Sequence, residues 1–278
     1  MNHFPRKIGF TVYNEKPEDY FDYAFEHKLK HIEINLEKDY SELARFDKKR
    51  VRKINKLAKE TNIKLSLHLP FSLDEANAFT FRKNPKILHL RESILLAKNI
   101  KATHIIAHIG RFEWYPVEHL SRRKALEKFV KFLLTVLDFC EENKVVICLE
   151  NLIPVNESAD HYLLGDKIDD FKFIFSQVES KFLKFCLDTG HANCGEGVLK
   201  FLFALQDKLD CIHYHDNNGL SDEHKQVGEG TVPWLNFAKK IIEIDFKGLF
   251  ISECRNVEPH KSAELIREYF QQIKEHHH

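Results

Sequence analysis

Six short apolar runs in this chain each end on a histidine, an aspartate or a glutamate. These residue types bind metal ions in proteins. Chance would scatter them over helices and loops, so their recurrence at the ends of the runs points to one polar site at one end of a parallel barrel. The six run-ending residues are His68, His108, Glu150, Asp188, His215 and Glu253.

Short runs rich in β-branched or aromatic residues alternate eight times with longer amphipathic stretches along the 278 residues. This alternation predicts either a doubly wound parallel sheet or a closed (β/α)8 barrel. No glycine-rich GxGxxG turn follows the first run, and polar strand ends fit a barrel, whose chemistry collects at the carboxyl ends of its strands. We therefore predict an α/β fold, a single (β/α)8 TIM barrel over residues 1–275. Strands are expected at 7–12, 30–35, 63–68, 103–108, 145–150, 182–188, 209–215 and 248–253, and helices near 17–27, 48–61, 85–99, 118–142, 168–178, 197–206, 234–244 and 260–274.

The cysteine pattern and the absence of targeting segments are typical of a cytoplasmic protein. The six cysteines form no CxxC pair and no framework spacing, so we expect buried thiols. The start of the sequence, MNHFPRKIGF, lacks the apolar segment of a signal peptide, and no run approaches membrane-spanning length. We interpret His276, His277 and His278 as the visible part of a purification tag and exclude them from the site.

The charge balance argues against a dedicated nucleic-acid-binding protein. Lys and Arg number 42, as do Asp and Glu, which gives a net charge of +0 instead of the basic surplus that phosphate binding favours. The basic stretch KKRVRKI carries its apolar residues at helical spacing, so a solvated outer helix face explains it. Nucleic acid is disfavoured as a partner but not excluded, since a neutral protein can hold a local basic cleft.

Four strand-end residues form the core of a predicted metal site. Glu150, Asp188, His215 and Glu253 supply three carboxylates and one imidazole from four consecutive strands. An oxygen-rich set of this kind suits Zn²⁺ or Mn²⁺, with Mg²⁺ as a further candidate, and leaves room for substrate oxygens. We therefore expect a divalent metal as the cofactor.

Five further residues extend the predicted site. His68 and His108 come from the two preceding strands and are able to hold a second metal, with Glu150 as a bridge. The loops add His191, in DTGHAN, and the pair Asp222 and His224, in SDEH. An aspartate, a nearby histidine and one more histidine form a three-ligand set with an open position, as in catalytic zinc sites.

Taken one at a time, these residues have plainer explanations. A single strand-end histidine is more often a hydrogen-bonded core residue than a ligand, and a loop Asp-Glu-His usually faces solvent. The joint pattern favours a cation, because a ring of uncompensated polar strand ends is costly to bury. The residues two positions earlier are expected to form a packed layer beneath the site, so His213 is interpreted as a buried histidine and not as a ligand; this layer comprises Ser66, Ile106, Cys148, Cys186, His213 and Ile251.

Seven short motifs resemble the xylose isomerase-like (β/α)8 superfamily, which groups sugar isomerases and epimerases with apurinic-site nucleases of the endonuclease IV type. The motifs run through the strands of the chain and are specific as a set: LHLP, AHIG, LEN, LDTGHAN, HYHDN…DEH, VGEGTVPW and SEC.

The epimerase side of this resemblance implies one metal ion and a pair of metal-bound glutamates that flank the substrate. By position these catalytic residues are Glu150 and Glu253, and Asp188 and His215 complete the metal site. In this interpretation the substrate-binding residues are His191, His68 and His108. The chain departs from the ketose 3-epimerase pattern in one respect, since Ser221 and Asp222 occupy the stretch where a substrate-binding arginine is expected.

The nuclease side implies three zinc ions held by nine residues. The first ion would be held by His68, His108 and Glu150. Glu150 would bridge to the second ion, which would be held by Asp188, His215 and Glu253, and the third ion would lie among His191, Asp222 and His224. All nine positions carry the right residue type. Acidic residues in the loops NLEKDYSEL and PFSLDEANAF oppose this interpretation, because a DNA-gripping surface should be basic.

We therefore predict a metal-dependent isomerase or epimerase of a small sugar, sugar phosphate or polyol derivative. It would act by glutamate-mediated proton transfer through a metal-stabilised enediolate. The alternative is a multi-zinc phosphodiesterase acting on abasic DNA, and a third candidate is a non-catalytic ligand-binding barrel. The expected partner is a sugar-like small molecule, with no membrane; neither the identity of the substrate nor the oligomeric state follows from these patterns.

Overall fold

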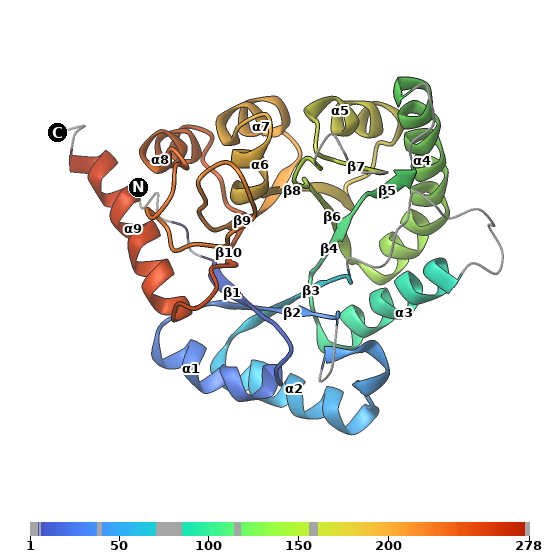
Figure 1. Cartoon of the computed structure of the whole chain (residues 1–278). Helices are drawn as coiled ribbons and strands as arrows, with labels where there is room; N and C mark the ends of the chain where they lie inside the picture. Colours follow the sequence, from blue (N-terminus) through green and yellow to red (C-terminus); the bar gives the residue numbers. More distant parts are fainter. Residues whose placement is uncertain are drawn as a thin grey trace.

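Eight parallel strands close into a barrel in the computed structural model, which describes residues 5, 7–37, 41–70, 85–113, 118–155 and 161–275 (Figure 1). The closed order is β1-β10-β9-β8-β6-β4-β3-β2. The barrel strands are β1 (Ile8–Val12), β2 (His31–Asn35), β3 (Lys64–His68), β4 (His104–His108), β6 (Val146–Glu150), β8 (Leu183–Asp188), β9 (Leu209–Tyr214) and β10 (Leu249–Ser252).

Helices cover the outside of the barrel between successive strands (Figure 1). They comprise the 3-10 helices Pro17–Tyr20 and Leu43–Arg45 and the α-helices α1 (Phe21–Glu26), α2 (Lys48–Thr61), α3 (Pro85–Ile100), α4 (Glu118–Asn143), α5 (Ile168–Gln177), α6 (Thr189–Cys194), α7 (Val198–Leu205), α8 (Trp234–Glu243) and α9 (Pro259–Glu275).

The predicted (β/α)8 barrel is confirmed. Each predicted strand coincides with an observed one to within one residue at either end.

Three predicted segments lie partly or fully outside the described residues. They are residues 71–79 of the loop PFSLDEANAF, residues 38–40 of the loop NLEKDYSEL, and residues 276–278, interpreted as a tag. No described helix combines the length and the apolar character needed to cross a membrane.

Helix α2 illustrates how local chemistry sets the outer layer. The Asp47 side chain accepts a hydrogen bond from the Arg50 backbone nitrogen at 2.7 Å and so caps the helix start. Asn62 ends the helix in the left-handed conformation, at φ 56°. Ile54 is buried in the core, whereas the basic residues of KKRVRKI are partly or fully exposed. The stretch is therefore a solvated helix face, as predicted.

An antiparallel strand pair and a short helix are among the structural features that were not predicted. Strands β5 (Gly110–Glu113) and β7 (His161–Leu164) form a separate antiparallel pair beside the barrel, after β4 and β6. The residues of DTGHAN after Asp188, expected to form a loop, fold into helix α6. Both elements are short, and neither has a run long enough to show a hydrophobic period.

The barrel interior beneath the site is a layer of fully buried side chains. The six residues predicted for this layer are all fully buried: Ser66, Ile106, Cys148, Cys186, His213 and Ile251. The cysteines are free thiols. Close packing in this layer leaves little room for water beneath the candidate ligands.

A buried arginine ties the end of β7 to the outer helices. Arg122 of α4 donates from Nε to Asp170 Oδ1 at 2.8 Å, and its Nη2 contacts both Asp166 and Asp170. The Gly165 backbone nitrogen donates to Asp170 Oδ2 at 2.7 Å. Burial opposes the charge, but hydrogen bonds to Asp170 and the nearby carboxylates raise the pKa of Arg122. One cation thus holds two buried carboxylates and the turn after β7.

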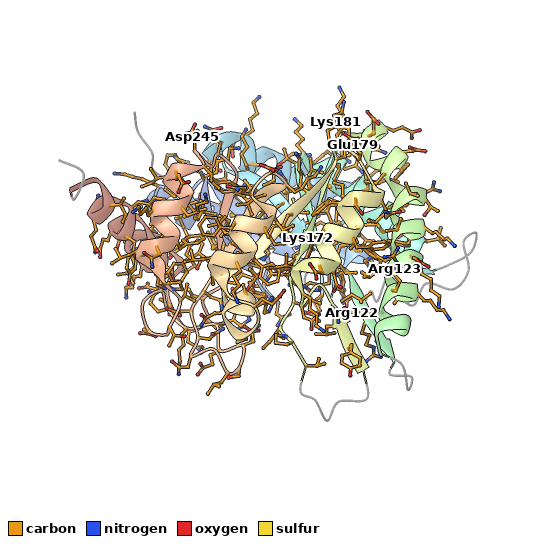
Figure 2. The ribbon with its side chains drawn as sticks, turned by 90° about the horizontal axis from the view of Figure 1, so that it is seen from above. Arg122, Arg123, Lys172, Glu179, Lys181 and Asp245 are labelled. Carbon is orange, nitrogen blue, oxygen red and sulfur yellow. The ribbon has the colours of Figure 1, made fainter. Side chains whose placement is uncertain are left out.

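Replacing Arg122 by Gln should destabilise the protein by about 3–5 kcal/mol, because it leaves Asp166 and Asp170 buried without their cation. Arg123→Gln is the matched control on the same helix (Figure 2), since the Arg123 side chain is 58% exposed, pairs with Glu127 and lies over the Phe173 ring, and it compensates no buried carboxylate in the described structure. The control should change stability by less than about 1 kcal/mol. Urea unfolding followed by circular dichroism measures both, and equal effects would contradict the proposed role of Arg122.

Candidate metal centre

The barrel brings the six predicted strand-end residues to one rim. Four of them are the last residues of β3, β4, β6 and β8, and the other two directly follow β9 and β10. Their relative exposure is 8% or less, so they face the interior and not the solvent. The residues are His68, His108, Glu150, Asp188, His215 and Glu253.

The Glu150 carboxylate is shared by two imidazoles. Glu150 Oε2 lies 3.1 Å from His68 Nε2 and 3.1 Å from His108 Nε2. The other nitrogen of His68, Nδ1, contacts the Leu69 carbonyl oxygen at 2.8 Å. A ring nitrogen fixed on a backbone carbonyl orients the opposite nitrogen, as is common among metal-binding histidines.

A second group forms around Asp188. Asp188 Oδ2 lies 3.1 Å from His215 Nε2, and Asp188 Oδ1 accepts a hydrogen bond from the His191 backbone nitrogen at 2.6 Å. This second bond caps α6, so the carboxylate that faces the site also starts the helix that carries His191. Potential ligand atoms of Asp188, His191 and His215 all lie within 4.8 Å of one another.

Asn151 links the group around Glu150 to the group around Asp188. Its Nδ2 donates to the Asp188 carbonyl oxygen at 3.0 Å, and its Oδ1 accepts from the Asp188 nitrogen at 2.8 Å. The Asn151 carbonyl oxygen contacts His191 Nδ1 at 2.9 Å. This residue, the last of the LEN motif, therefore links the end of β6 to the end of β8 and to α6.

The loop pair Asp222 and His224 folds back onto the rim. Asp222 Oδ2 lies 2.8 Å from His224 Nε2 and 3.6 Å from His191 Nε2. His224 Nδ1 contacts the Glu253 carbonyl oxygen at 2.8 Å, and its ring stacks on His215 at a centroid distance of 4.1 Å. All nine residues predicted from sequence are thus brought to the same end of the barrel; their roles as ligands stay predictions.

Asp216 anchors the loop that carries this pair. The buried carboxylate accepts hydrogen bonds from the Val232 nitrogen at 3.1 Å, the Gly228 nitrogen at 3.0 Å and Trp234 Nε1 at 2.8 Å. A Cβ at Gly230 would lie 2.1 Å from the Asn217 carbonyl oxygen, so only glycine fits this close approach. The motif VGEGTVPW thereby packs the loop against the barrel.

Sequence reasoning missed Glu33, a fully buried carboxylate on β2 beneath the candidate ligands. It accepts hydrogen bonds from Ser66 Oγ at 2.8 Å and Thr11 Oγ1 at 3.2 Å, and its Oε1 lies 3.0 Å from His213 Nε2. His213 Nδ1 in turn contacts Glu150 Oε1 at 3.1 Å. His213 is buried, as predicted. The sequence signal for Glu33 was an acid at an inward-facing position inside the apolar strand HIEIN.

Burial and mutual contact set the charges of this cluster. Burial would raise the pKa of Glu150, but His213, His108 and His68 hold it well below its usual range. Burial would lower the pKa of His68, but Glu150 raises it to about 9. Burial also opposes the charge of His191, but Asp188 and Asp222 raise its pKa to about 10. Glu150 is thus held ionised, and protons on His68 and His191 balance the charge of the buried acids. Burial, in contrast, lowers the pKa of His108. A divalent cation fits the same donors and would take the place of those protons.

A pocket of about 320 Å³ opens above the cluster. This volume lies at the small end of the range for ligand sites. Apolar residues form part of its wall, and seven of the nine candidate ligands line it; Asp188 and His215 are not among its described lining residues. The lining residues are Tyr13, Asn35, Glu37, His68, His108, Glu150, Leu152, Ile153, Leu163, His191, Asp222, His224, Glu253 and Arg255.

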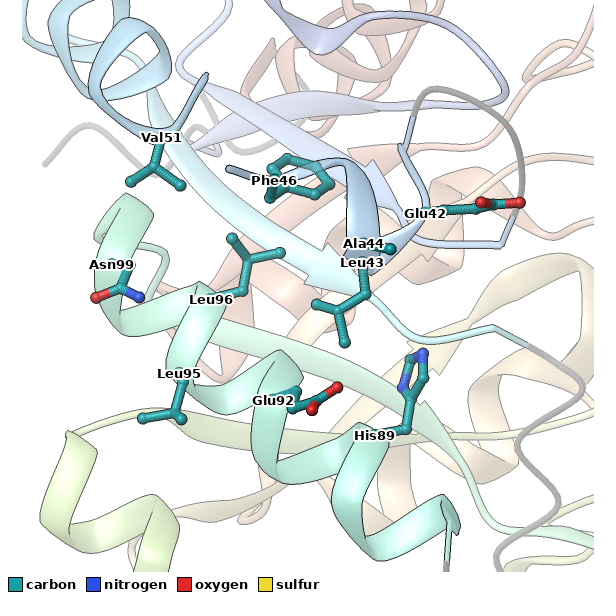
Figure 3. A pocket seen from close by; sticks show the side chains of 10 residues that line it. All are labelled: Glu42, Leu43, Ala44, Phe46, Val51, His89, Glu92, Leu95, Leu96 and Asn99. Carbon is teal, nitrogen blue, oxygen red and sulfur yellow. The ribbon is translucent and has the colours of Figure 1, made fainter. Parts of the chain in front are cut away.

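A separate pocket of about 500 Å³ lies on the outside of the barrel, between α2, α3 and the 3-10 helix Leu43–Arg45 (Figure 3). Leucines, a phenylalanine and a valine make up much of its wall, with Glu42, Glu92 and Asn99 among its polar residues. It contains none of the candidate ligands, so it is not part of the metal centre.

These features define a class of protein: a parallel (β/α)8 barrel with acids and imidazoles gathered at the carboxyl rim of its strands. The family described as Xylose isomerase-like TIM barrel matches residues 21–276. The chain belongs to this family, which confirms the resemblance drawn from its motifs.

Individual relatives agree with this assignment. The uncharacterized protein MJ1614 of Methanocaldococcus jannaschii is 31% identical over 192 residues, which are 68% of this chain and 70% of that protein. A D-tagatose 3-epimerase-like protein superposes with a TM-score of 0.83 at 24% identity, over 98% of this chain and 100% of its own. A D-psicose 3-epimerase, solved in the presence of D-fructose, gives 0.74 at 15% identity, over 95% and 97%. The two structures share the fold of this chain.

Gly190 should be essential to the geometry of the centre. A Cβ there would lie 1.9 Å from His215 Cε1, so Gly190→Ala must displace the His215 ring. We expect affinity for Zn²⁺ or Mn²⁺ to fall about 10–100-fold, as when groups that orient metal-binding histidines are changed. Calorimetric titration measures the affinity, and Cys194→Ala, in the same helix, is the control. Unchanged metal affinity in a folded Gly190→Ala protein would show that His215 is not a ligand.

Proposed function

We propose that this protein is a divalent-metal-dependent isomerase or epimerase of small sugars or related hydroxy-carbonyl compounds. One observation carries the proposal: two carboxylates from separate strands, Glu150 and Glu253, line the same small pocket and contact the same imidazole. His213 Nδ1 lies 3.1 Å from Glu150 Oε1 and 3.5 Å from Glu253 Oε1. Two acids flanking one pocket are what proton removal and proton return require.

The donor set supports a divalent cation. Glu150, Asp188, His215 and Glu253 would hold it, since carboxylates and imidazoles together suit Zn²⁺ and Mn²⁺. When bound, the cation would act as a Lewis acid that stabilises negative charge developing on substrate oxygens. The names of two proteins with the same fold, a D-tagatose 3-epimerase-like protein and a D-psicose 3-epimerase, support a sugar as the substrate.

The glutamates would move the proton. Glu150 enters the reaction ionised, because the imidazoles around it hold its pKa well below the usual range once burial is offset. One of the two carboxylates would take the carbon-bound proton, and the other would supply a proton to the opposite face. Thr11 Oγ1 lies 3.4 Å from Glu253 Oε1 and 3.2 Å from Glu33 Oε1, so its one hydroxyl hydrogen is shared between these two carboxylates.

The rest of the pocket would position the substrate and limit access of water. His191, with His68 and His108, would contact substrate hydroxyls from the floor of the pocket. Leu152, Ile153 and Leu163 also line the pocket. An apolar wall beside the glutamates protects a reactive carbanion-like species from bulk water.

Glu150→Gln and Glu253→Gln should each reduce exchange of the substrate's carbon-bound hydrogen with solvent by about 10²–10⁴-fold, because each removes one acid–base group. The measurement is deuterium uptake from D₂O into D-tagatose or D-fructose by the Mn²⁺-loaded protein, followed by NMR. Glu229→Gln is the control, since Glu229 is exposed and lies outside the pocket. Full exchange in both pocket variants would rule out this mechanism.

A multi-zinc phosphodiesterase is the second candidate. It is favoured by one observation, the gathering of all nine predicted ligand residues, including Asp222 and His224, at one rim. Charge argues the other way, because Arg255 is the one lysine or arginine among the described residues that line the pocket. A surface that holds DNA needs several cations for the phosphates.

Metal content separates the two candidates. We expect one tightly bound Mn²⁺ or Zn²⁺ per chain, measured by plasma mass spectrometry after dialysis, and no cleavage of a duplex that contains an abasic site. Removal of the ion by a chelator should abolish hydrogen exchange, and Mn²⁺ should restore it. Three zinc ions per chain together with cleavage of the duplex would replace the isomerase by the nuclease.

A further inference from the structure

A second group of potential metal ligands lies at the amino end of the barrel, opposite the candidate metal centre. His104 is the first residue of β4, Asp210 is the second residue of β9, and Cys148 lies midway along β6. One donor atom from each side chain lies within 4.8 Å of the other two. In the closed order β6 and β8 separate β4 from β9 (Figure 1), so these side chains meet inside the barrel and not along one pair of neighbouring strands.

His104 presents one ring nitrogen to this group. It alternates along β4 with Ile106 and His108, so its side chain points into the barrel. His104 Nδ1 lies 2.7 Å from Thr103 Oγ1, and His104 Nε2 lies 3.2 Å from Asp210 Oδ2. A partner on one ring nitrogen fixes the orientation of the other, which is the arrangement that metal-binding histidines commonly have.

Asp210 reaches the group because β9 has a bulge at this position. Phe185 of β8 pairs with Leu209, and the next residue, Cys186, pairs with Cys211, so Asp210 is the extra residue of β9. In a regular strand Asp210 would point to the side opposite Cys211, toward the outer helices. A bulge re-aims a side chain, and bulges are over-represented beside active sites. The bulge therefore turns a carboxylate into the end of the barrel.

Cys148 adds a sulfur donor. Its thiol is free and fully buried in the layer beneath the candidate metal centre. Thiolate, imidazole and carboxylate together suit Zn²⁺, whereas Mn²⁺ and Mg²⁺ prefer oxygen ligands. The side chains of His104 and Asp210 are 12% and 33% exposed. An ion can therefore enter from the solvent, and water can complete a tetrahedral set of ligands.

The charges around the group are compatible with a bound dication. Burial would raise the pKa of Asp210, but His104, Lys184 and Lys7 lower it, so the carboxylate is ionised. Zn²⁺ together with one carboxylate and one thiolate carries no net charge. Binding would therefore place no excess positive charge beside the two lysines.

We propose that His104, Cys148 and Asp210 form a second metal site, which binds Zn²⁺ and joins β4, β6 and β9 at the amino end of the barrel. This site does not depend on the proposed function, and none of the nine candidate ligands at the rim is a cysteine. Binding must remove the thiol proton and open the contact between His104 and Asp210. The ion should therefore be held less tightly than the ion at the rim and should be lost on dialysis.

Co²⁺ tests the proposal, because it occupies tetrahedral zinc sites and a thiolate ligand gives it an intense charge-transfer band in the near ultraviolet. Co²⁺ is titrated into the Mn²⁺-loaded protein and followed by absorption. Co²⁺ that replaces Mn²⁺ at the rim has only nitrogen and oxygen ligands there and gives no such band. We expect the band to saturate, and Zn²⁺ to abolish it, since Zn²⁺ binds such donors more tightly than Co²⁺.

Substitutions locate the ion. Cys148→Ser should remove the band, because oxygen replaces the sulfur. His104→Gln and Asp210→Asn keep the sulfur, and each should weaken Co²⁺ binding at this site by more than the loss of an orienting group does, about 10–100-fold. Both of these side chains are partly exposed, so the two variants should fold even where Cys148→Ser does not. Cys186→Ser is the control, a buried thiol of the same layer outside the three donors, and it should keep the band.

The proposal fails if saturating Co²⁺ gives no thiolate band, or if the band is unchanged in Cys148→Ser or in both His104→Gln and Asp210→Asn. A band that is lost in Cys186→Ser and kept in Cys148→Ser would assign the ion to the neighbouring group of Cys186, Cys211 and His213 instead. Hydrogen exchange at the rim is measured separately with Mn²⁺ alone and should be unchanged in His104→Gln. The second site and the proposed isomerase can therefore fail independently of each other.

Discussion

Three carboxylates, Glu33, Glu150 and Asp188, lie almost completely buried at the carboxyl end of the barrel. An isolated ionised carboxylate in such surroundings is strongly unfavourable, so each needs a cationic or hydrogen-bonding partner. His213 contacts Glu33 and Glu150, and His215 contacts Asp188. The imidazoles that surround the acids therefore offset the cost of burying these carboxylates. The same acids and imidazoles make the rim suitable for a divalent cation.

The same contacts connect the folding of the chain to the geometry of the site. Asp188 both faces the candidate centre and caps α6, so the helix that carries His191 starts on a candidate ligand. Asn151 links the ends of β6 and β8, and Asp216 holds the loop of Asp222 against the barrel. Asn151 and Asp216, which are not candidate ligands, thus fix the positions of residues that are. We therefore expect few substitutions around the rim to leave metal affinity unchanged.

Most of the barrel follows from the sequence because strands buried on both faces leave short, continuous apolar runs that end on polar residues. Glu33 escaped detection because it lies inside such a run and not at its end, where only the facing of β2 reveals it. Helix α6 and the β5–β7 pair were missed because each has six residues or fewer and forms through tertiary contacts, such as the Asp188 cap. The return of Asp222 and His224 to the rim depends in the same way on Asp216, which no local pattern indicates.

The rim divides into two sectors with different physical requirements. From β3 round to β10, acids and imidazoles compensate one another, so a substitution there disturbs the charge balance of several neighbours at once. Over β1 and β2 the pocket is bounded by Tyr13, Asn35 and Glu37, and of these Tyr13 interacts with Glu253, which helps to raise the pKa of its buried hydroxyl. Substitutions of Asn35 or Glu37 in this second sector can alter which molecule binds without removing a partner from a buried carboxylate. A barrel arranged in this way can keep one chemistry and change its substrate, because some residues that line the pocket lie outside the network of acids and imidazoles proposed to act on the substrate.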